Sequence, residues 1–325
     1  MRWLALSILL LATTSHAQPL RDRVRLGAFV NGLPYEDSGA FRALERKLGT
    51  KLEVLAGFVD WEYVLGNQRD LALSDQGKRT LLYSWEPHCV GERCVSFASV
   101  ARGEHDAYLL RVAESMKRFP HDLYVRPWGE LNAEWSAWQP DSGRPRAGTR
   151  DEFLAAWRHL HTFFRERGVT NLKFVFNPDA SDFDTNTRVP SIWPGAEYVD
   201  VLGIDGYNWG DGPHEQWRTF EDIFARMYEV VTALHPSAPV WICELGSKEP
   251  RVDDGSPARP APVDPRHDKG RWLTDMMQSE RFPRLTTLVS FNVRKERDFR
   301  LESSASSLQA MRKQLRLRTG SRSAR

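Results

Sequence analysis

The sequence has few cysteines, no excess of charge of one sign and no glycine-rich dinucleotide loop. A formal net charge of +2, from 45 basic and 43 acidic residues, gives no field that would favour nucleic acid or a membrane surface as a partner. The missing glycine-rich loop argues against an open nucleotide-binding sheet. His88 with Cys89 and Cys94 lacks the second ligand pair of a structural zinc site. We therefore expect no metal and no cofactor.

Residues 1–17 have the composition of a cleavable signal peptide. Arg2 precedes an apolar run, Trp3 to Ala12, that is too short to span a bilayer, and Ser15-His16-Ala17 offers small residues at a cleavage site. Cleavage before Gln18 would give a secreted or periplasmic protein.

The three cysteines fit an exported protein. Cys89 and Cys94 lie in one short stretch, where they would be able to form a disulfide in an oxidising compartment. Cys243 lies in an apolar run and is predicted to be a buried, unreactive thiol.

Short β-rich runs alternate with longer stretches of helical period from Arg25 onward, which is typical of a parallel sheet with crossover helices. The predicted strands are Arg25 to Val30, Leu52 to Phe58, Thr80 to Ser84, Leu123 to Arg126, Leu172 to Phe176, Val199 to Ile204, Val240 to Cys243 and Leu288 to Phe291. The predicted helices include Gly39 to Leu48, His105 to Phe119, Asp151 to Arg167, Phe220 to Leu234, Lys269 to Glu280 and Ser304 to Gln314, whereas Asn177 to Tyr198 reads more as a loop than as a helix.

Eight strand and helix pairs without a break in composition predict an α/β fold with one closed (β/α)8 TIM barrel over residues 18–314. The arginine- and serine-rich residues 315–325 lack apolar periodicity, so they are predicted to form a disordered basic tail. A protein that binds nucleic acid or the cell envelope through this tail is a less favoured alternative.

Two glutamates stand where predicted strands end. Glu130 follows the fourth strand among aromatic residues, and Glu244 directly follows the four apolar residues of the seventh strand. The ends of these strands face each other across the mouth of an eight-stranded barrel, where reacting groups gather. Cleavage of a glycosidic bond needs two such opposed carboxyl groups. Glu130 is therefore predicted to be the general acid/base and Glu244 the nucleophile of a retaining glycosidase.

The environments of the two glutamates are expected to differ. Trp128 and Trp135 are predicted to desolvate Glu130 and raise its pKa, as a proton donor requires. Hydrogen bonds from Arg126 and Tyr207 are predicted to keep Glu244 ionised. Two other acidic residues follow apolar runs: Asp205 precedes a glycine and is interpreted as a turn residue, and Glu86 as a rim contact to substrate or to Arg126.

The residues quoted so far resemble the glycoside hydrolase family 26 pattern. The segments that carry the resemblance are Arg126 to Trp138, Ser84-Trp85-Glu86-Pro87, Gly203 to Asn208, Glu244, Phe291-Asn292, Lys295-Glu296 and Asp298-Phe299-Arg300, and they span nearly the whole mature chain. The resemblance implies the (β/α)8 fold, Glu130 as acid/base, Glu244 as nucleophile, Tyr207 as the hydroxyl that holds it, and Trp135 as a ring that stacks on sugar.

Two positions depart from that family pattern. Gly129 stands where the mannan-cleaving members usually have histidine before the acid/base, and Phe299 stands where tryptophan is frequent. The predicted substrate-binding residues are Arg126, Tyr207, Trp85, Trp128, Trp135, Trp209 and Asn292.

The sequence thus predicts a monomeric endo-β-glycanase, with β-1,4-mannan as the first substrate. The alternatives are a β-glucan, a xylan, a bacterial exopolysaccharide, or a barrel that binds polysaccharide without cutting it.

Overall fold

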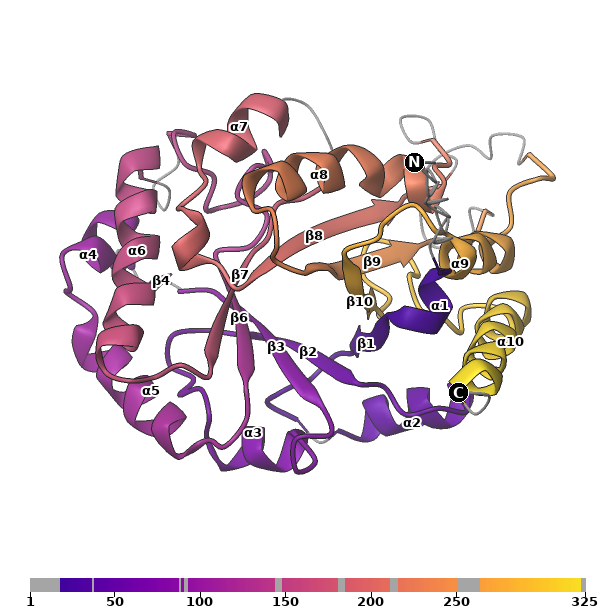
Figure 1. Ribbon diagram of the computed structural model, residues 1–325, viewed down its shortest axis with the longest axis horizontal. Coiled ribbons are helices and arrows are strands. Elements are labelled where there is room, and N and C mark those ends of the chain that lie inside the picture. The colour runs from indigo at the N-terminus through magenta and orange to yellow at the C-terminus, as the bar shows by residue number, and fades with distance from the viewer. Residues whose placement is uncertain are drawn as a thin grey trace, which may run out of the picture.

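The computed structural model describes residues 18–36, 38–87, 89–90, 93–143, 148–180, 185–210, 216–250 and 264–322. The predicted signal peptide and His88 lie outside these ranges. Within them, eight parallel strands close into a barrel in the order β1-β10-β9-β8-β7-β6-β3-β2. Figure 1 shows the strands at the centre and the helices around them. The prediction of a (β/α)8 barrel is confirmed.

Each predicted barrel strand is present. The strands are β1 (Arg25–Phe29), β2 (Val54–Val59), β3 (Thr80–Trp85), β6 (Leu123–Pro127), β7 (Leu172–Phe176), β8 (Val201–Asn208), β9 (Val240–Ser247) and β10 (Leu285–Phe291). β8 and β9 continue past their predicted ends because their polar last residues still pair, up to Asn208 with Ser247. Apolar periodicity alone does not detect such residues.

The helices pack their apolar stripes against the outside of the barrel. They are α1 (Leu20–Arg23), α2 (Gly39–Leu48), α3 (Gln68–Leu73), α4 (Phe97–Ala101), α5 (Asp106–Arg118), α6 (Arg150–Glu166), α7 (Thr185–Ser191), α8 (Phe220–Leu234), α9 (Lys269–Gln278) and α10 (Ala305–Arg322), with a 3-10 turn η1 (Ala196–Tyr198). α6 begins at a capping box of Thr149 and Glu152 and buries Phe153, Trp157 and Leu160 at helical spacing. No described helix combines the length and apolar character needed to cross a membrane.

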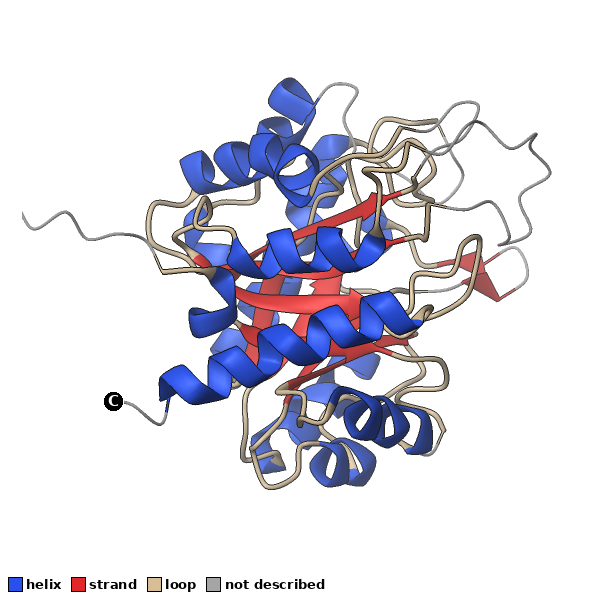
Figure 2. Cartoon of the chain, turned by 90° about the vertical axis from the view of Figure 1, so that its right-hand side faces the viewer, coloured by secondary structure: helices blue, strands red, loops and turns tan. Residues whose placement is uncertain are grey.

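Two sequence predictions on secondary structure are wrong. The segment 177–198, interpreted as a loop, contains α7 and η1. The C-terminal helix α10 does not end near residue 314 but continues to Arg322 along the outside of the barrel (Figure 2). Leu315 is buried, and Arg318 donates to Glu53 Oε2 at 2.8 Å, so packing and an ion pair hold a segment that has little apolar periodicity.

The interior of the barrel forms a small apolar core below the mouth, separate from the larger core between strands and helices. Its buried members are Val54, Ala56, Leu82, Val175, Val201, Trp241, Cys243 and Val289. Cys243 is fully buried and unpaired, as predicted.

A two-stranded ribbon, β4 (Cys89–Val90) and β5 (Arg93–Cys94), sets the backbone of Cys89 opposite that of Cys94. Their side chains lie outside the described part of the structure, so the disulfide stays a prediction.

Candidate active site

A pocket of about 690 Å³ opens at the carboxyl ends of the strands. The residues that line it are Phe58, Ser84, Glu86, Arg126, Gly129, Glu130, Trp135, Asp179, Asp205, Tyr207, Trp209, Gln216, Arg218, Ile223, Glu244, Phe291, Lys295, Glu296 and Phe299. Both predicted glutamates are among them. Parallel barrels gather reactive groups at this end, and the volume suits a ligand of small to moderate size.

A strained turn after β6 places Glu130 at the edge of this pocket. Trp128 and Glu130 both have positive φ, 53° and 55°, which costs a non-glycine residue roughly 1–3 kcal/mol. The amide of Glu130 donates to the carbonyl of Asn177 at 3.0 Å, so the neighbouring strand end helps to fix this turn. Gly129 between them has no such φ, and a Cβ there would meet nothing within 4 Å. The strained backbone at Trp128 and Glu130 therefore orients the Glu130 side chain, and the space next to Gly129 stays open.

A β-bulge turns Glu244 into the pocket. Trp241 and Cys243 belong to the core inside the barrel, whereas Ile242 and Leu245 belong to the core outside it. Simple alternation would place Glu244 outside, but the register with β8 shifts from Ile204↔Ile242 to Asp205↔Glu244. The extra residue puts two consecutive side chains on the inner face. A carboxylate that would otherwise face the helices thus lies at the mouth.

The two glutamates lie close together across the pocket. One carboxylate oxygen from each of Glu130, Asp205 and Glu244 lies within 4.8 Å of those of the other two. Carboxyl groups about 5 to 5.5 Å apart suit retaining hydrolysis, whereas inverting enzymes need roughly 6.5 to 9.5 Å for an intervening water. The separation therefore matches a double displacement.

The environment of Glu130 favours its protonated form. Burial, with the negative charges of Asp179 and Glu244, raises the pKa of Glu130 to about 8. The indole of Trp135 donates to Glu130 Oε2 at 2.8 Å and acts in the opposite direction. The predicted rise in pKa by desolvation is confirmed, with two acidic neighbours adding to it.

Glu244 instead receives donors on both oxygens. Tyr207 Oη donates to Oε2 at 2.5 Å, and Arg126 Nη2 donates to Oε1 at 2.5 Å. Both predicted contacts are confirmed. Two hydrogen bonds from different strands restrict the rotation of this carboxylate.

The interpretation of Asp205 as a turn residue is wrong. Asp205 is fully buried within β8 and accepts from Arg126 Nη1 and from Asn177 Nδ2, both at 2.7 Å. It stands two residues before Tyr207 on the same strand, so the strand period of two would have placed both side chains on the inner face.

The carboxylates of Glu130, Asp205 and Glu244 lie close enough together to be considered as ligands of a metal ion. Arg126, however, already donates to Asp205 and Glu244 and supplies positive charge there. The donor set thus suits an internal ion pair better than a divalent cation.

The predicted tryptophans divide into two groups. Trp135 and Trp209 line the pocket and are 56% and 36% exposed, so their rings are accessible to a ligand. Trp85 and Trp128 are almost fully buried and do not line the pocket, so the structure does not bring them together with the predicted glutamates. On β3 the inner face takes Leu82 and Ser84, so Trp85 points outward, where it stacks on Trp61. Trp128 packs against Phe97 in the same outer core.

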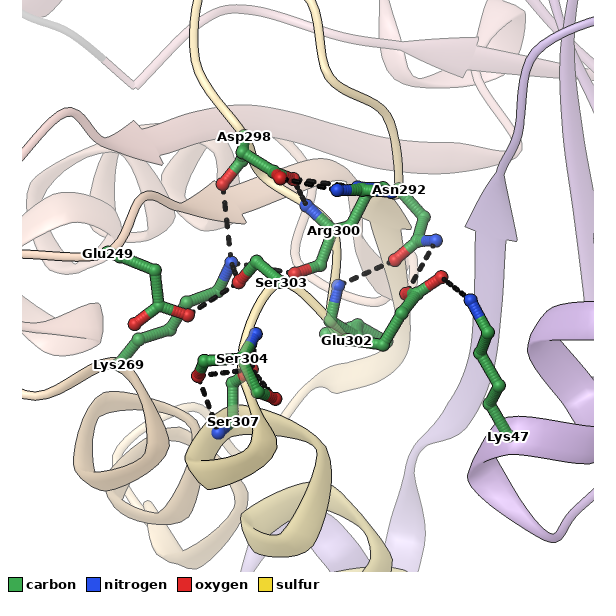
Figure 3. Close-up of polar contacts among 11 residues, drawn as sticks. Lys47, Glu249, Lys269, Asn292, Asp298, Arg300, Glu302, Ser303, Ser304 and Ser307 are labelled. Carbon is green, nitrogen blue, oxygen red and sulfur yellow. Dashed lines mark hydrogen bonds and ion pairs between the residues drawn. The ribbon is translucent and has the colours of Figure 1, made fainter. Parts of the chain in front are cut away.

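Asn292 also does not line the pocket. Its amide group donates to Glu302 Oε2 at 3.1 Å, and its oxygen accepts from the amide of Leu301 at 2.7 Å (Figure 3). It is buried, does not line the pocket, and closes the loop after β10 instead.

Other pocket residues were outside the predicted binding set. Asp179 lies beyond β7 in a stretch with no apolar pattern to mark it. Glu86 lines the pocket, and burial raises its pKa while the charge of Arg126 lowers it. This agrees with the interpretation of Glu86 as a rim residue near Arg126.

Comparison with known proteins gives one consistent family. Residues 96–245 match the sequence profile described as Glycosyl hydrolase family 26. Endoglucanase H of Acetivibrio thermocellus is 30% identical over 294 residues, which are 89% of this chain and 30% of that protein. A mannan endo-1,4-beta-mannosidase of Bacillus subtilis is 27% identical over 158 residues, which are 46% of this chain and 38% of that protein. The matches thus span about a third of these curated relatives.

Solved structures share the fold. The GH26 beta-mannanase BoMan26A from Bacteroides ovatus superposes with a TM-score of 0.63 at 17% identity, covering 91% of this chain and 89% of that one. The catalytic domain of the Bacillus sp. JAMB-750 GH26 endo-beta-1,4-mannanase gives 0.62 at 16% identity, covering 90% and 86%. These structures show the same fold, and the profile match over residues 96–245 agrees with the resemblance to glycosyl hydrolase family 26 found in the sequence.

Proposed function

We propose that this protein is a retaining endo-β-glycanase in which Glu130 is the general acid/base and Glu244 the nucleophile. The observation that carries the proposal is the pair itself. Glu130 and Glu244 oppose each other within 4.8 Å, one with a pKa raised to about 8 and the other held by two donors. A carboxyl group that can donate a proton beside a second carboxyl group that can attack is the pair that glycoside cleavage requires.

The reaction runs in two displacements. Glu244 attacks the anomeric carbon and forms a glycosyl ester as the bond to the leaving oxygen breaks, and Glu130 gives its proton to that oxygen. Glu130, now ionised, takes a proton from water, which attacks the same carbon and releases Glu244. Tyr207 and Arg126 hold the attacking carboxylate in one orientation throughout.

The exposed rings of Trp135 and Trp209 would bind the apolar faces of sugar rings. Trp135 also contacts the proposed acid, so a sugar stacked there would lie beside the bond to be cut. Both rings line a pocket open to solvent on the barrel rim, which favours cleavage within a chain.

β-1,4-Mannan is the first candidate substrate. Two Bacillus subtilis relatives and one from Caldalkalibacillus mannanilyticus carry names of mannan endo-1,4-beta-mannosidases, at 27% to 35% identity over part of this chain.

β-Glucan is the second candidate, and two observations favour it. Gly129 leaves open space beside Glu130 where the mannan-cleaving members of the family usually carry histidine. In addition, the relative that matches 89% of this chain is named an endoglucanase. Xylan and bacterial exopolysaccharides stay in the substrate panel as the remaining alternatives.

The test is reducing-end release from mannan, glucomannan, mixed-linkage β-glucan, xylan and exopolysaccharide. Glu130→Gln and Glu244→Gln are expected to lower turnover on the order of a thousandfold. Glu134→Gln changes an exposed glutamate in the same loop that lies outside the pocket, and it serves as the matched control.

Azide separates the two roles with an activated aryl β-glycoside. Azide added to Glu244→Ala should give an α-glycosyl azide, because it replaces the nucleophile. Azide added to Glu130→Ala should give the β-glycosyl azide, because it attacks the ester on Glu244. The absence of hydrolysis on every substrate, with polysaccharide still retained in affinity electrophoresis, would support the rival function of a non-catalytic binding barrel.

We further propose that the protein is exported as a monomer after cleavage before Gln18. Mass spectrometry of the mature chain in periplasmic and culture fractions tests the cleavage site and the compartment. Light scattering at several concentrations tests the monomer.

A further inference from the structure

A fully buried lysine lies behind the pocket wall. Lys269, the first residue of α9, is 0% exposed. Its ammonium donates to the carbonyl of Arg300 at 2.7 Å, to Ser303 Oγ at 2.8 Å and to the carbonyl of Asp298 at 3.4 Å (Figure 3). All three acceptors belong to the turn 298–303 after β10. Burying an ammonium group is costly, and these bonds compensate for its lost hydration.

Charged neighbours surround this ammonium from two segments: Glu249 follows β9, while Asp298 and Glu302 belong to the turn 298–303. Burial lowers the pKa of Lys269 to about 8, and these three negative charges act in the opposite direction. Ser303 Oγ donates to Glu249 Oε1 at 2.5 Å. The lysine therefore joins the start of α9, the loop after β9 and the turn after β10.

The turn 298–303 carries an aromatic side chain into the pocket. The ring of Phe299 lies 4.9 Å from that of Tyr207 and 5.3 Å from that of Trp209, and all three residues line the pocket. Phe299 packs so closely on β9 that a Cβ at Gly246 would meet it at 2.8 Å. A shift of the turn would therefore move the ring that supports Tyr207, the donor to Glu244.

We propose that Lys269 is a positioning residue for the reaction, which fixes the turn 298–303 so that Phe299 holds Tyr207 against Glu244. The inference rests on the proposed function and adds a residue that touches no substrate. Its path runs from the ammonium to the carbonyls of Asp298 and Arg300, through Phe299 to Tyr207, and from Tyr207 to the nucleophile.

A double-mutant cycle tests this path. Lys269→Met is expected to lower kcat/KM about 10- to 100-fold, in line with the cost of a small misplacement at a reacting centre. In a Phe299→Ala background the same substitution should change kcat/KM less than twofold, because the ring that transmits the effect is gone. An equal loss in both backgrounds would mean that Lys269 only stabilises the fold and would overturn the proposal.

Lys47→Met is the matched control. Lys47 is largely exposed and pairs with Glu302 Oε1 at 3.1 Å on the other side of the same turn (Figure 3). It should leave kcat/KM unchanged. Ser303→Ala, which removes only one of the three acceptors and the bond to Glu249, should show a smaller loss in the same direction and serves if Lys269→Met does not fold.

Hydrogen exchange provides a readout that does not need activity. The amides of Phe299 and Leu301 donate to Val293 O and Asn292 Oδ1, and they should exchange faster in Lys269→Met or Ser303→Ala while those of β8 do not change. Unchanged exchange rates at these two amides would contradict the claim that Lys269 fixes the turn 298–303. If wild-type protein hydrolyses no glycan, the proposed function fails and the effect of Lys269 on catalysis fails with it. Hydrogen exchange would still show whether Lys269 fixes the turn 298–303.

Discussion

Arg126 joins Glu244 to Asp205 through one guanidinium. Its Nη2 donates to Glu244 Oε1 at 2.5 Å, and its Nη1 donates to Asp205 Oδ2 at 2.7 Å. Ser84 accepts a further bond from Nη2. The proposed nucleophile is therefore fixed to β3, β6 and β8 at once, and its position depends on a buried charge network.

Removal of this guanidinium should destabilise the protein and abolish activity. Arg126→Met would leave Asp205 buried without its charge partner, at an expected cost of about 3–5 kcal/mol in the free energy of unfolding. Urea denaturation measures the loss. Lys117→Met, which removes an exposed pair with Glu114, should leave the free energy of unfolding almost unchanged.

A double variant separates stability from activity at this site. Arg126→Met with Asp205→Asn removes both charges, so it should regain part of the lost stability but none of the lost kcat/KM. A double variant no more stable than Arg126→Met would show that the buried charge of Asp205 is not the cause of the loss.

The Tyr207 hydroxyl should matter for turnover. Tyr207→Phe keeps the ring that packs on Phe299 and removes one bond to the carboxylate of Glu244. A hydrogen bond to a charged group contributes about 1.5–3 kcal/mol, so kcat/KM should fall roughly 10- to 100-fold. Tyr124→Phe, at the interior aromatic contact with Trp241, provides a control that should change kcat/KM less than twofold. Equal rates for both variants would remove Tyr207 from the mechanism.

The pH profile of kcat/KM should report Glu130. The acid must be protonated to assist departure, so activity should fall as pH rises through its pKa of about 8. Asp179→Asn removes a negative charge that raises this pKa. The alkaline limb should then move to lower pH, and a limb that stays in place would show that another group controls it.

Trp135→Phe should move the same limb in the opposite direction. The indole bond to Glu130 Oε2 stabilises the ionised carboxylate, so its loss should raise the pKa of Glu130 further. The phenyl ring keeps an aromatic face for the sugar. Steady-state rates between pH 5 and pH 10 on one soluble substrate measure both shifts, and a downward shift in Trp135→Phe contradicts this account.

The sequence was sufficient to predict the barrel, because the alternation of strand and helix patterns marks its elements. It was also sufficient to predict the two opposed glutamates, because each follows the end of an apolar strand. It did not place Trp85 and Trp128 correctly, since a residue just past a strand faces inward or outward according to register. The bulge at Glu244 shows the same limit, because strict alternation would set that carboxylate outside the barrel. Arg318 on α10 is held by Glu53, an ion pair between residues far apart in the chain that local composition does not reveal.

Proton NMR of the first product tests the central claim most directly. With a β-linked substrate cut by the wild-type protein, double displacement through Glu244 predicts that the β-anomer appears first and the α-anomer only later by mutarotation. The α-anomer as the first product would mean inversion, and that result would contradict a nucleophile and an acid placed as Glu244 and Glu130 are here.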